Sequence, residues 1–487
     1  MSEELAAKLD AIWADDRLGR RGEAQLLLDY IESVATRPVL REDSQSFTLA
    51  IDVGYGEGKT FFLRRLQQHL AITHPVAFVD AWADDTLDQP LTALAATLET
   101  ALKPLKAKPA VKSKLANVIS KTGNVAKAAA LGALRRGVAY VISDKGADAV
   151  SAALNDAPSD IVDSAKAAAA IGEDVVAATV AEFSGVAPGK VMRDRIDAFE
   201  DGKKGIQDLK ASLRALVDAL KGQALTPPII IIIDELDRCR PTYAVKLLEE
   251  IKHIFDVPGL IFVFGMHGEQ LSNSMSAAYG AKFDGASYLR RFITRRYKLR
   301  TPRLRPLVTE LLKQRGLIDN KQLDINFWLV KGRGFQHDRG DLDDIVAKYF
   351  EMYEVPVREV FHLIDALQTS AALIRGQPLY LPYYLPLLIS RHLQPNSVEL
   401  VSPRVDPQWE YAYLNESREL VTVSPWALAQ TFHQLFKLPL KEFNDLDSND
   451  TLNRIAWSMK GGRSGLNDPS NYDDLIEAVG RFDGPST

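Results

Sequence analysis

Five consecutive isoleucines, at residues 229–233, constrain the fold of this chain more than any other stretch of its sequence. A strand that is buried on both faces of a parallel sheet has a continuous apolar run of this kind. Similar apolar runs occur at residues 46–54, 74–82 and 259–271, and segments with helical spacing alternate with them. The alternation predicts an α/β fold in which helices flank a parallel sheet.

The run at residues 46–54 leads into a stretch that is similar to a phosphate-binding loop. Gly58, Lys59 and Thr60 match the end of the Walker A pattern G-x-x-x-x-G-K-[ST]. Glycines let backbone N–H groups curl around phosphates, the lysine reaches the β- and γ-phosphates, and the threonine hydroxyl binds Mg²⁺. The alternative is a glycine turn that carries a lysine by chance. We expect the nucleotide to contact Gly54, Tyr55, Gly56, Glu57, Gly58, Lys59, Thr60 and Phe61.

The first glycine of the Walker A pattern is absent, and Val53 stands in its place. A β-branched residue fits well at the end of a strand, so the loop can begin one residue later, at Gly54. Gly56 and Gly58 stay in register with the lysine, and Tyr55 would pack beside the loop or near the ribose. We therefore expect the loop to bind nucleotide despite Val53.

Two carboxylates, Asp234 and Glu235, follow the isoleucine run directly. An aspartate at the end of a buried strand can hold Mg²⁺ through its water shell, and an adjacent carboxylate can polarise an attacking water. The alternative, that both residues only cap the next helix, is a poor explanation for two such groups beside five isoleucines. Together with the loop, they predict a nucleotide site with Asp234 at the metal and Glu235 as the catalytic base.

The composition does not indicate a nucleic-acid or membrane protein. The chain has 59 basic and 64 acidic residues, and its formal net charge of −5 provides no global positive field. A local basic patch is the alternative, so nucleic acid stays open as a partner although the charge does not indicate it. No stretch approaches about 18 uncharged apolar residues, so we expect no transmembrane segment. The single cysteine, Cys239, fits a reducing compartment, and the N-terminus lacks the features of a signal peptide. We expect a cytoplasmic protein.

Composition also divides the chain. Residues 103–205 are rich in alanine, lysine and glycine, which predicts an inserted helical sub-domain, and the alternative is a disordered linker. Beyond residue 300 helical spacing replaces the strands, and prolines mixed with aromatics at residues 378–393 predict a packed bend between helices. We expect an N-terminal helical lead (1–45), a first half of the core (46–102), an Ala-rich helical insertion (103–205), a second half of the core (206–300), and a C-terminal helical lid and tail (301–487).

Several stretches resemble the KAP family of P-loop NTPases, a branch of the ASCE division. The segment DDRLGRRGEAQLLLDYI (15–31) is similar to the family's opening element, FVDAWADD (78–85) to its strand ending in tryptophan, and SYLRRF (287–292) to its tyrosine-leucine-x-basic element. The segment IDELDRCRPTYAVKLLEEIKHIFDVPGLIFVFG (233–265) is the most specific match. The resemblance implies a P-loop NTPase fold with ATP and Mg²⁺ as ligands, and ATP rather than GTP rests on it alone.

The chain departs from the family pattern in three ways. Val53 replaces the first loop glycine, and His267 stands where relatives often carry an aspartate. The insertion that anchors many relatives in the membrane is here too polar to cross a bilayer. We therefore expect a form that lacks the transmembrane insertion.

The resemblance also implies roles for arginines. Arg358, at the start of a C-terminal helix, is similar in position to a sensor-2 arginine that could contact the γ-phosphate, and the alternative is an arginine in solvent. Arg291 is a candidate for a finger supplied across a subunit contact, as are Arg238 and Arg290. The alternative for each is an ordinary surface arginine.

These observations predict a P-loop ATPase in which Lys59, Glu235, Arg291 and Arg358 serve catalysis and turnover drives a conformational or assembly change. We expect it to act as a homo-oligomer or with a partner protein of the same system, and bacterial relatives that resemble phage-exclusion ATPases suggest antiphage defence. The alternative is a weakly hydrolysing, nucleotide-gated scaffold that assembles partner proteins, which Val53 and His267 favour slightly. A small-molecule kinase is a third reading, against which the glutamate after Asp234 argues, because it points to water as the acceptor.

Overall fold

The structure is a computed structural model of the 487-residue chain. It describes residues 3–35, 47–125 apart from 88, 106, 107 and 124, 188–324 apart from 255 and 281, and 328–482 apart from 332, 333, 339, 340, 375, 416, 462 and 464. The chain forms two compact units. Unit 1 comprises residues 1–24, 54–62 and 299–487, and unit 2 comprises residues 25–53 and 63–298.

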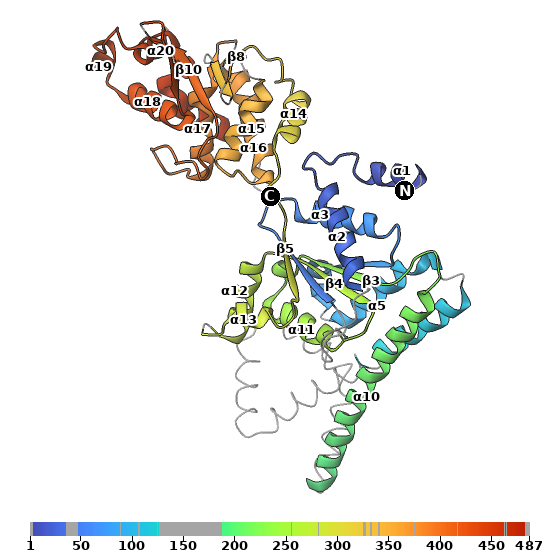
Figure 1. The fold of residues 1–487 in the computed structure, drawn as a ribbon. Helices are drawn as coiled ribbons and strands as arrows, with labels where there is room; N and C mark the ends of the chain where they lie inside the picture. Colours follow the sequence, from blue (N-terminus) through green and yellow to red (C-terminus); the bar gives the residue numbers. More distant parts are fainter. Residues whose placement is uncertain are drawn as a thin grey trace. The chain divides into compact units, whose positions relative to one another are not determined.

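Unit 2 is built on a five-stranded sheet in which all neighbouring strands are parallel (Figure 1). The strand order is β2 (Val76–Asp80), β3 (Ile229–Asp234), β4 (Leu260–Met266), β1 (Phe47–Asp52) and β5 (Arg295–Lys298). Every residue of β3 and β4 is buried, as expected for inner strands of a parallel sheet that is covered on both faces. The predicted α/β fold with a parallel sheet is confirmed.

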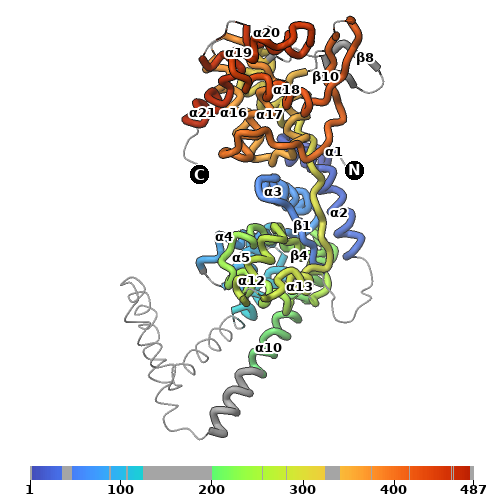
Figure 2. Tube along the Cα trace, turned by 90° about the vertical axis from the view of Figure 1, so that its left-hand side faces the viewer, coloured from blue at the N-terminus to red at the C-terminus, as the bar shows by residue number. Residues whose placement is uncertain are grey.

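Helices of unit 2 complete its core. Figure 2 shows α4, α5, α12 and α13 gathered around the strands, while α10 leads away from them. Leucines of α5 and of the C-terminal part of α10 pack in one apolar cluster with the isoleucines of β3. The helices of this unit are α4 (Ala81–Asp84), α5 (Pro90–Ala101), α10 (Pro188–Leu220), α11 (Pro241–Ile251), α12 (Gly268–Tyr279) and α13 (Gly285–Leu289), while α2 (Arg21–Ala35) and α3 (Lys59–Leu70) have residues in both units.

Strand β5 ends the row of described strands and carries a different kind of residue. Arg295, Arg296 and Lys298 are exposed, and the strand contains no aliphatic side chain. Charged residues on a terminal strand oppose pairing with strands of other molecules. The polar sequence also explains why an apolar pattern did not predict this strand.

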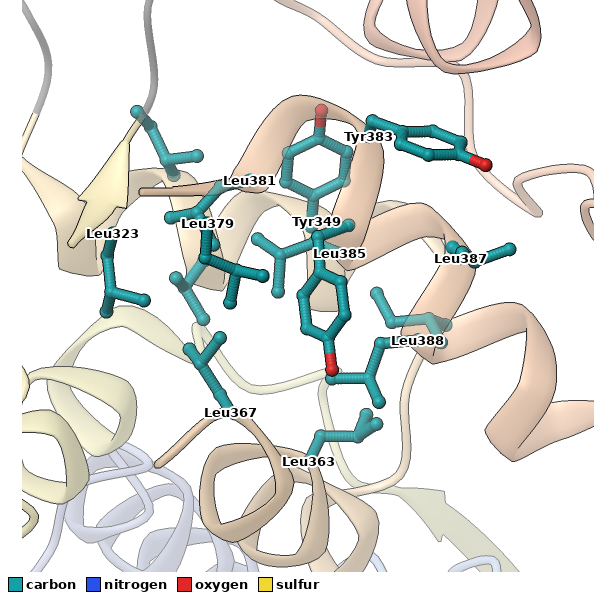
Figure 3. Packing of buried hydrophobic residues seen from close by; sticks show 14 of the residues in the cluster. Leu323, Tyr349, Leu363, Leu367, Leu379, Leu381, Tyr383, Leu385, Leu387 and Leu388 are labelled. Atoms are coloured by element: carbon teal, nitrogen blue, oxygen red, sulfur yellow. The ribbon is translucent and has the colours of Figure 1, made fainter. Parts of the chain in front are cut away.

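Unit 1 has its own apolar core, formed mostly by helices (Figure 3). Tyr349 lies at its centre among leucines, and its hydroxyl is 3.2 Å from the hydroxyl of Tyr411, so two buried polar groups satisfy each other. The helices of this unit are α1 (Glu3–Ile12), α14 (Arg305–Gln314), α15 (Leu342–Met352), α16 (Val357–Leu373), α17 (Leu381–Leu393), α18 (Pro425–Lys437), α19 (Leu440–Asn444), α20 (Thr451–Lys460) and α21 (Tyr472–Gly480).

Two sequence predictions for the C-terminal part were wrong. Residues 378–393 do not form a bend between helices, because α17 runs through Pro386 and the strand β9 (Leu379–Tyr380) precedes it. The strands also do not end at residue 300. A four-stranded sheet has the order β11 (Leu420–Val423), β10 (Glu410–Leu414), β7 (Trp328–Lys331) and β8 (Gly334–Asp338), and β9 pairs with β6 (Leu323–Asp324).

Most of the Ala-rich stretch that was predicted as an insertion lies outside the described residues. Of its described parts, residues 109–123 are helical and α10 covers the C-terminal end. Among the described residues of the chain, none of the helices has the length and apolar character needed to span a bilayer. The proposed division of the chain into five segments remains a prediction.

Gly265 in β4 leaves room for two side chains, and this leads to a stability test. A Cβ atom at position 265 would lie 2.1 Å from Cδ1 of Leu63 and 2.9 Å from Oδ1 of Asp234. We expect Gly265→Ala to lower the free energy of unfolding by about 1–3 kcal/mol, the usual cost of overpacking a core, seen as a lower midpoint of urea unfolding.

Gly202→Ala in α10 is the matched control. A Cβ atom there has no neighbour within 4 Å, and alanine favours a helix over glycine by up to about 1 kcal/mol. This variant should keep or raise the midpoint. Equal losses in the two variants would contradict the close packing at Gly265.

Candidate nucleotide-binding site

The carboxyl edge of the parallel sheet has the topology of a ligand site. The connection from β1 to β2 passes β4 and β3 toward one side of the sheet. The connection from β4 to β5 passes β1 toward the opposite side. Ligands of open α/β sheets bind outside the carboxyl ends of the strands, where the direction of the connections reverses. The ends of β1 and β4 form this point, and residues 53–61 and 267–268 follow them directly.

Strand β1 and the start of α12 are joined closely at this edge. Oδ1 of Asp52 accepts the backbone N–H of Gly268 at 2.9 Å, and a Cβ atom at Gly268 would lie 2.8 Å from Oδ2 of Asp52. His267 is the N-cap of α12, because its Nδ1 accepts the N–H of Gln270 at 3.2 Å. Histidine thus provides the cap acceptor that an aspartate also provides, so its presence does not argue for a different function.

Val53 behaves as a strand residue. Its N–H donates to the carbonyl oxygen of Met266 at 3.1 Å, which continues the β1–β4 ladder, and its side chain is buried. The loop has its left-handed residues at Gly56 (φ 79°) and Gly58 (φ 81°), and Gly54 is not among the residues with positive φ. The expectation that Val53 finishes the strand and that the loop begins at Gly54 agrees with this geometry, and the left-handed residues are the next two glycines, Gly56 and Gly58.

Lys59 is the first residue of α3 and is buried, with 7% of its surface exposed. The N–H groups of the first turn of a helix lack intrahelical partners and attract phosphate. Thr60 and Tyr55 are exposed and Phe61 is half-buried. The loop therefore presents a helix N-terminus, a lysine and a hydroxyl together in one short segment.

Within unit 1 the loop contacts the start of α16. The backbone N–H of Arg358 donates to the carbonyl oxygen of Gly56 at 2.9 Å. A Cβ atom at Gly56 would lie 3.2 Å from Cβ of Arg358. The backbone of Arg358, the predicted lid arginine, thus lies next to the loop. A contact of its guanidinium group with phosphate remains a prediction.

The N-terminal element around residue 18 also lies at the loop, which sequence reasoning missed. Cδ1 of Leu18 would be 3.7 Å from a Cβ atom at Gly58. Burial raises the pKa of the Glu57 carboxyl, the positive charge of Arg20 opposes this, and the charge of Glu354 adds to it. The only signal for this contact was the family resemblance of residues 15–31, which assigned no contact to them.

At the end of β3 the two predicted carboxylates are buried in unit 2. Asp234 is 1% exposed, and its Oδ1 accepts the N–H of Glu235 at 2.9 Å. Glu235 has left-handed backbone angles, φ 61° and ψ 23°, at the start of the 3₁₀ turn Leu236–Arg238. Few residues other than glycine adopt this conformation, and such residues cluster at functional sites.

The three candidate finger arginines have different surroundings. Nε of Arg238 lies 2.5 Å from Oε2 of Glu235 in its own chain. Arg290 donates to the hydroxyl of Ser287, and the guanidinium carbon of Arg291 lies 5.8 Å from the ring centroid of Tyr288. Arg290 and Arg291 are exposed. The role of Arg291 across a subunit contact remains a prediction.

Among the described residues, no group of three or more histidine, cysteine, aspartate or glutamate side chains could hold a metal ion. Mg²⁺ commonly takes only one or two protein oxygens and fills its shell with water and phosphate. Burial and nearby carboxylates raise the pKa of the Cys239 thiol to about 12, which makes it a poor nucleophile.

Comparison with known families agrees with this geometry. The family model described as the KAP family P-loop domain matches residues 20–333, which is more than half of the chain. The match includes the loop, both carboxylates and His267, whereas Arg358 lies beyond it. A search of curated proteins finds no match.

The left-handed glycine of the loop provides a test of its geometry. Alanine at position 56 would adopt φ 79° and crowd Arg358, and the left-handed conformation alone costs about 1–2 kcal/mol. We expect Gly56→Ala to weaken ATP binding more than tenfold in titration calorimetry.

Gly54→Ala is the control, because a Cβ atom there meets only Cγ of Glu57, at 3.6 Å, an ordinary contact. Its affinity should stay within about threefold of the parent. Equal weakening by both substitutions would mean that the loop needs flexibility at every glycine and not the left-handed turn at Gly56.

Proposed function

Because the chain belongs to the KAP family of P-loop NTPases, we propose that it hydrolyses ATP with Mg²⁺ and uses the cycle to drive a conformational or assembly change. The family supports nucleotide binding and NTP hydrolysis in general. The observation that carries the finer proposal is Glu235, held in a left-handed turn directly after the buried Asp234.

Binding of the phosphates is assigned to the loop. The backbone N–H groups around Gly56 and Gly58 would surround the phosphate oxygens, and the N-terminus of α3 adds partial positive charge. Lys59 would place its ammonium group at the β- and γ-phosphates. Tyr55, whose side chain is 46% exposed, can pack beside the bound nucleotide.

Magnesium binding is assigned to Thr60 and Asp234. The Thr60 hydroxyl would ligate the ion, and the carboxylate of Asp234 would hold it through water. Bound Mg²⁺ would neutralise charge on the phosphate oxygens. The N–H of Glu235 already donates to Oδ1 of Asp234, which fixes the orientation of this carboxylate.

The chemical step is an in-line displacement at phosphorus. The oxygen of a water molecule attacks the γ-phosphorus, the bond between this phosphorus and the β–γ bridging oxygen breaks, and ADP and phosphate leave. Glu235 orients the water and accepts its proton, which then passes to solvent. Arg358 and Arg291 are proposed to stabilise the charge of the transferred group, Arg358 from its own chain and Arg291 across a subunit contact.

A change in the C-terminal helices is a reasonable outcome of this cycle. The loop carbonyl at Gly56 accepts the N–H of Arg358 in α16, so rearrangement of the loop reaches this helix through one peptide group. Such a change could regulate assembly with further copies or with a partner protein. A role in antiphage defence is proposed from the resemblance to phage-exclusion ATPases alone.

Removal of the loop lysine tests the binding step. We expect Lys59→Ala to abolish measurable ATP·Mg²⁺ binding in titration calorimetry, because it removes the ammonium group assigned to the phosphates. The circular dichroism spectrum should stay the same, since Lys59 belongs to neither apolar cluster. Unchanged affinity in this variant would end the P-loop assignment.

Removal of the general base tests hydrolysis. We expect Glu235→Gln to keep ATP affinity and to lower phosphate release by roughly 10²–10⁴-fold, the usual contribution of a general base. Val53→Gly is the matched variant that restores the Walker A pattern, and it should change turnover less than about tenfold, or about 1.4 kcal/mol.

The scaffold alternative makes a different forecast for the parent protein. Tight ATP binding with no phosphate release, with or without nucleic acid, would favour a nucleotide-gated scaffold. Strong activation by Val53→Gly would show that the missing glycine impairs the enzyme.

A further inference from the structure

Arg238 and Glu235 are joined twice within one short turn. Nε of Arg238 lies 2.5 Å from Oε2 of Glu235, and the glutamate side chain is only 8% exposed. The backbone N–H of Arg238 also donates to the carbonyl oxygen of Glu235 at 3.0 Å. Both the side chain and the backbone of this arginine therefore contact the proposed base.

The position of Arg238 is fixed by α4 and the turn that follows it. Its guanidinium carbon lies 5.8 Å from the ring centroid of Trp82, a residue of α4 that is 56% exposed. Arg240, two residues after Arg238, is bound by Asp85. Oδ1 of Asp85 accepts from Nε of Arg240 at 2.7 Å, and Oδ2 accepts from the backbone N–H of Arg240 at 2.9 Å. The segment that carries Arg238 thus contacts Trp82 at Arg238 and Asp85 at Arg240.

This arrangement is unlike that of a finger supplied to another subunit. An arginine finger needs a guanidinium group that can extend into the site of another subunit, whereas the guanidinium of Arg238 is paired with a buried carboxylate of its own chain. A buried charge that loses its partner is strongly destabilised. Arg238 therefore has a local reason to stay where it is.

We propose that Arg238 is a positioning residue that holds Oε2 of Glu235 and so orients the carboxylate toward the attacking water. The assignment rests on the proposed ATP hydrolysis and adds that Arg238 acts within its own subunit. The backbone of Glu235 has left-handed angles, and the Arg238 guanidinium, a planar group, forms an ion pair with its Oε2. Trp82 supports this geometry because its ring lies under the guanidinium.

The test measures binding and chemistry separately in the full chain. We expect Arg238→Ala to keep the Kd for ATP·Mg²⁺ within about threefold and to lower the single-turnover rate of hydrolysis by about 10–100-fold, the usual effect of losing a group that orients a reacting residue. Guanidinium ions added at millimolar concentration should restore part of the rate. A residue with a merely structural role would not show this rescue.

Arg240→Ala is the matched control, because it removes a neighbouring arginine that pairs with Asp85. Any loss in this variant should appear as a lower Tm, and guanidinium ions should not raise its rate. The double variant Arg238→Ala, Glu235→Gln should be no slower than Glu235→Gln alone, since an effect that acts through Glu235 disappears with it.

The outcomes separate the positioning role from the function it rests on. Normal turnover in Glu235→Gln, or no turnover in the parent, would overturn the proposed hydrolysis and the positioning role with it. A slow Glu235→Gln variant beside an Arg238→Ala variant of normal rate would overturn the positioning role alone. A further loss in the double variant would do the same, because it would mean that Arg238 acts on the reacting groups by another route.

Discussion

The pairing of β4 with both β1 and β3 is the constraint on which the carboxyl edge of the sheet depends. Asp52 pairs with Met266 across one side of β4, and Ile233 pairs with Phe264 across the other. Neighbouring strands lie about 4.8 Å apart, so β1 and β3 are separated by two such spacings, about 9.6 Å. The start of the loop after β1 and the carboxylates after β3 are therefore set at fixed offsets along one edge. Without β4 between them, the ends of β1 and β3 would have no defined register.

The same edge contains an unfavourable backbone conformation, and a comparison of free energies shows how it persists. The left-handed backbone of Glu235 costs on the order of 1–3 kcal/mol. Complete burial of an isoleucine side chain contributes about 1.5–3 kcal/mol, and β3 buries five of them directly before Asp234. The strand thus stabilises the segment by several times the local strain. A Cβ atom does not fit at Gly265 or Gly268 either, because Leu63 and Asp234 occupy the space at the first and Asp52 occupies it at the second.

Local sequence patterns predicted the inner strands, the glycine loop and the two carboxylates, because each is specified by residues close together in the chain. Strand β5 was not predicted, since its residues are charged and its pairing with β1 is decided by a partner far away in sequence. The small sheet around β10 was also missed, because β10 pairs with β7 far away in the sequence, although its pairing with β11 is local. At the loop, the contacts of Leu18 and Arg358 depend on tertiary structure, which no motif records. Gly54 was expected to open the loop after Val53, and the backbone angles add that the left-handed residues of the loop are Gly56 and Gly58.

The carbonyl oxygen of Gly56 in the loop contacts the first turn of α16, and the strength of this contact limits how the nucleotide can act on the C-terminal helices. The first N–H groups of α16 have no partner inside the helix, and the carbonyl oxygen of Gly56 satisfies the one on Arg358. One such hydrogen bond contributes about 0.5–1.5 kcal/mol, which corresponds to a shift of at most about tenfold between two arrangements of α16. A switch from almost wholly one state to almost wholly the other needs about 5.5 kcal/mol. The backbone contact is therefore too weak to move α16 alone, and a strong response to ATP requires a charge-assisted contact in addition. The guanidinium of Arg358, attached to the same residue, is proposed to contact the γ-phosphate and would supply such a contact.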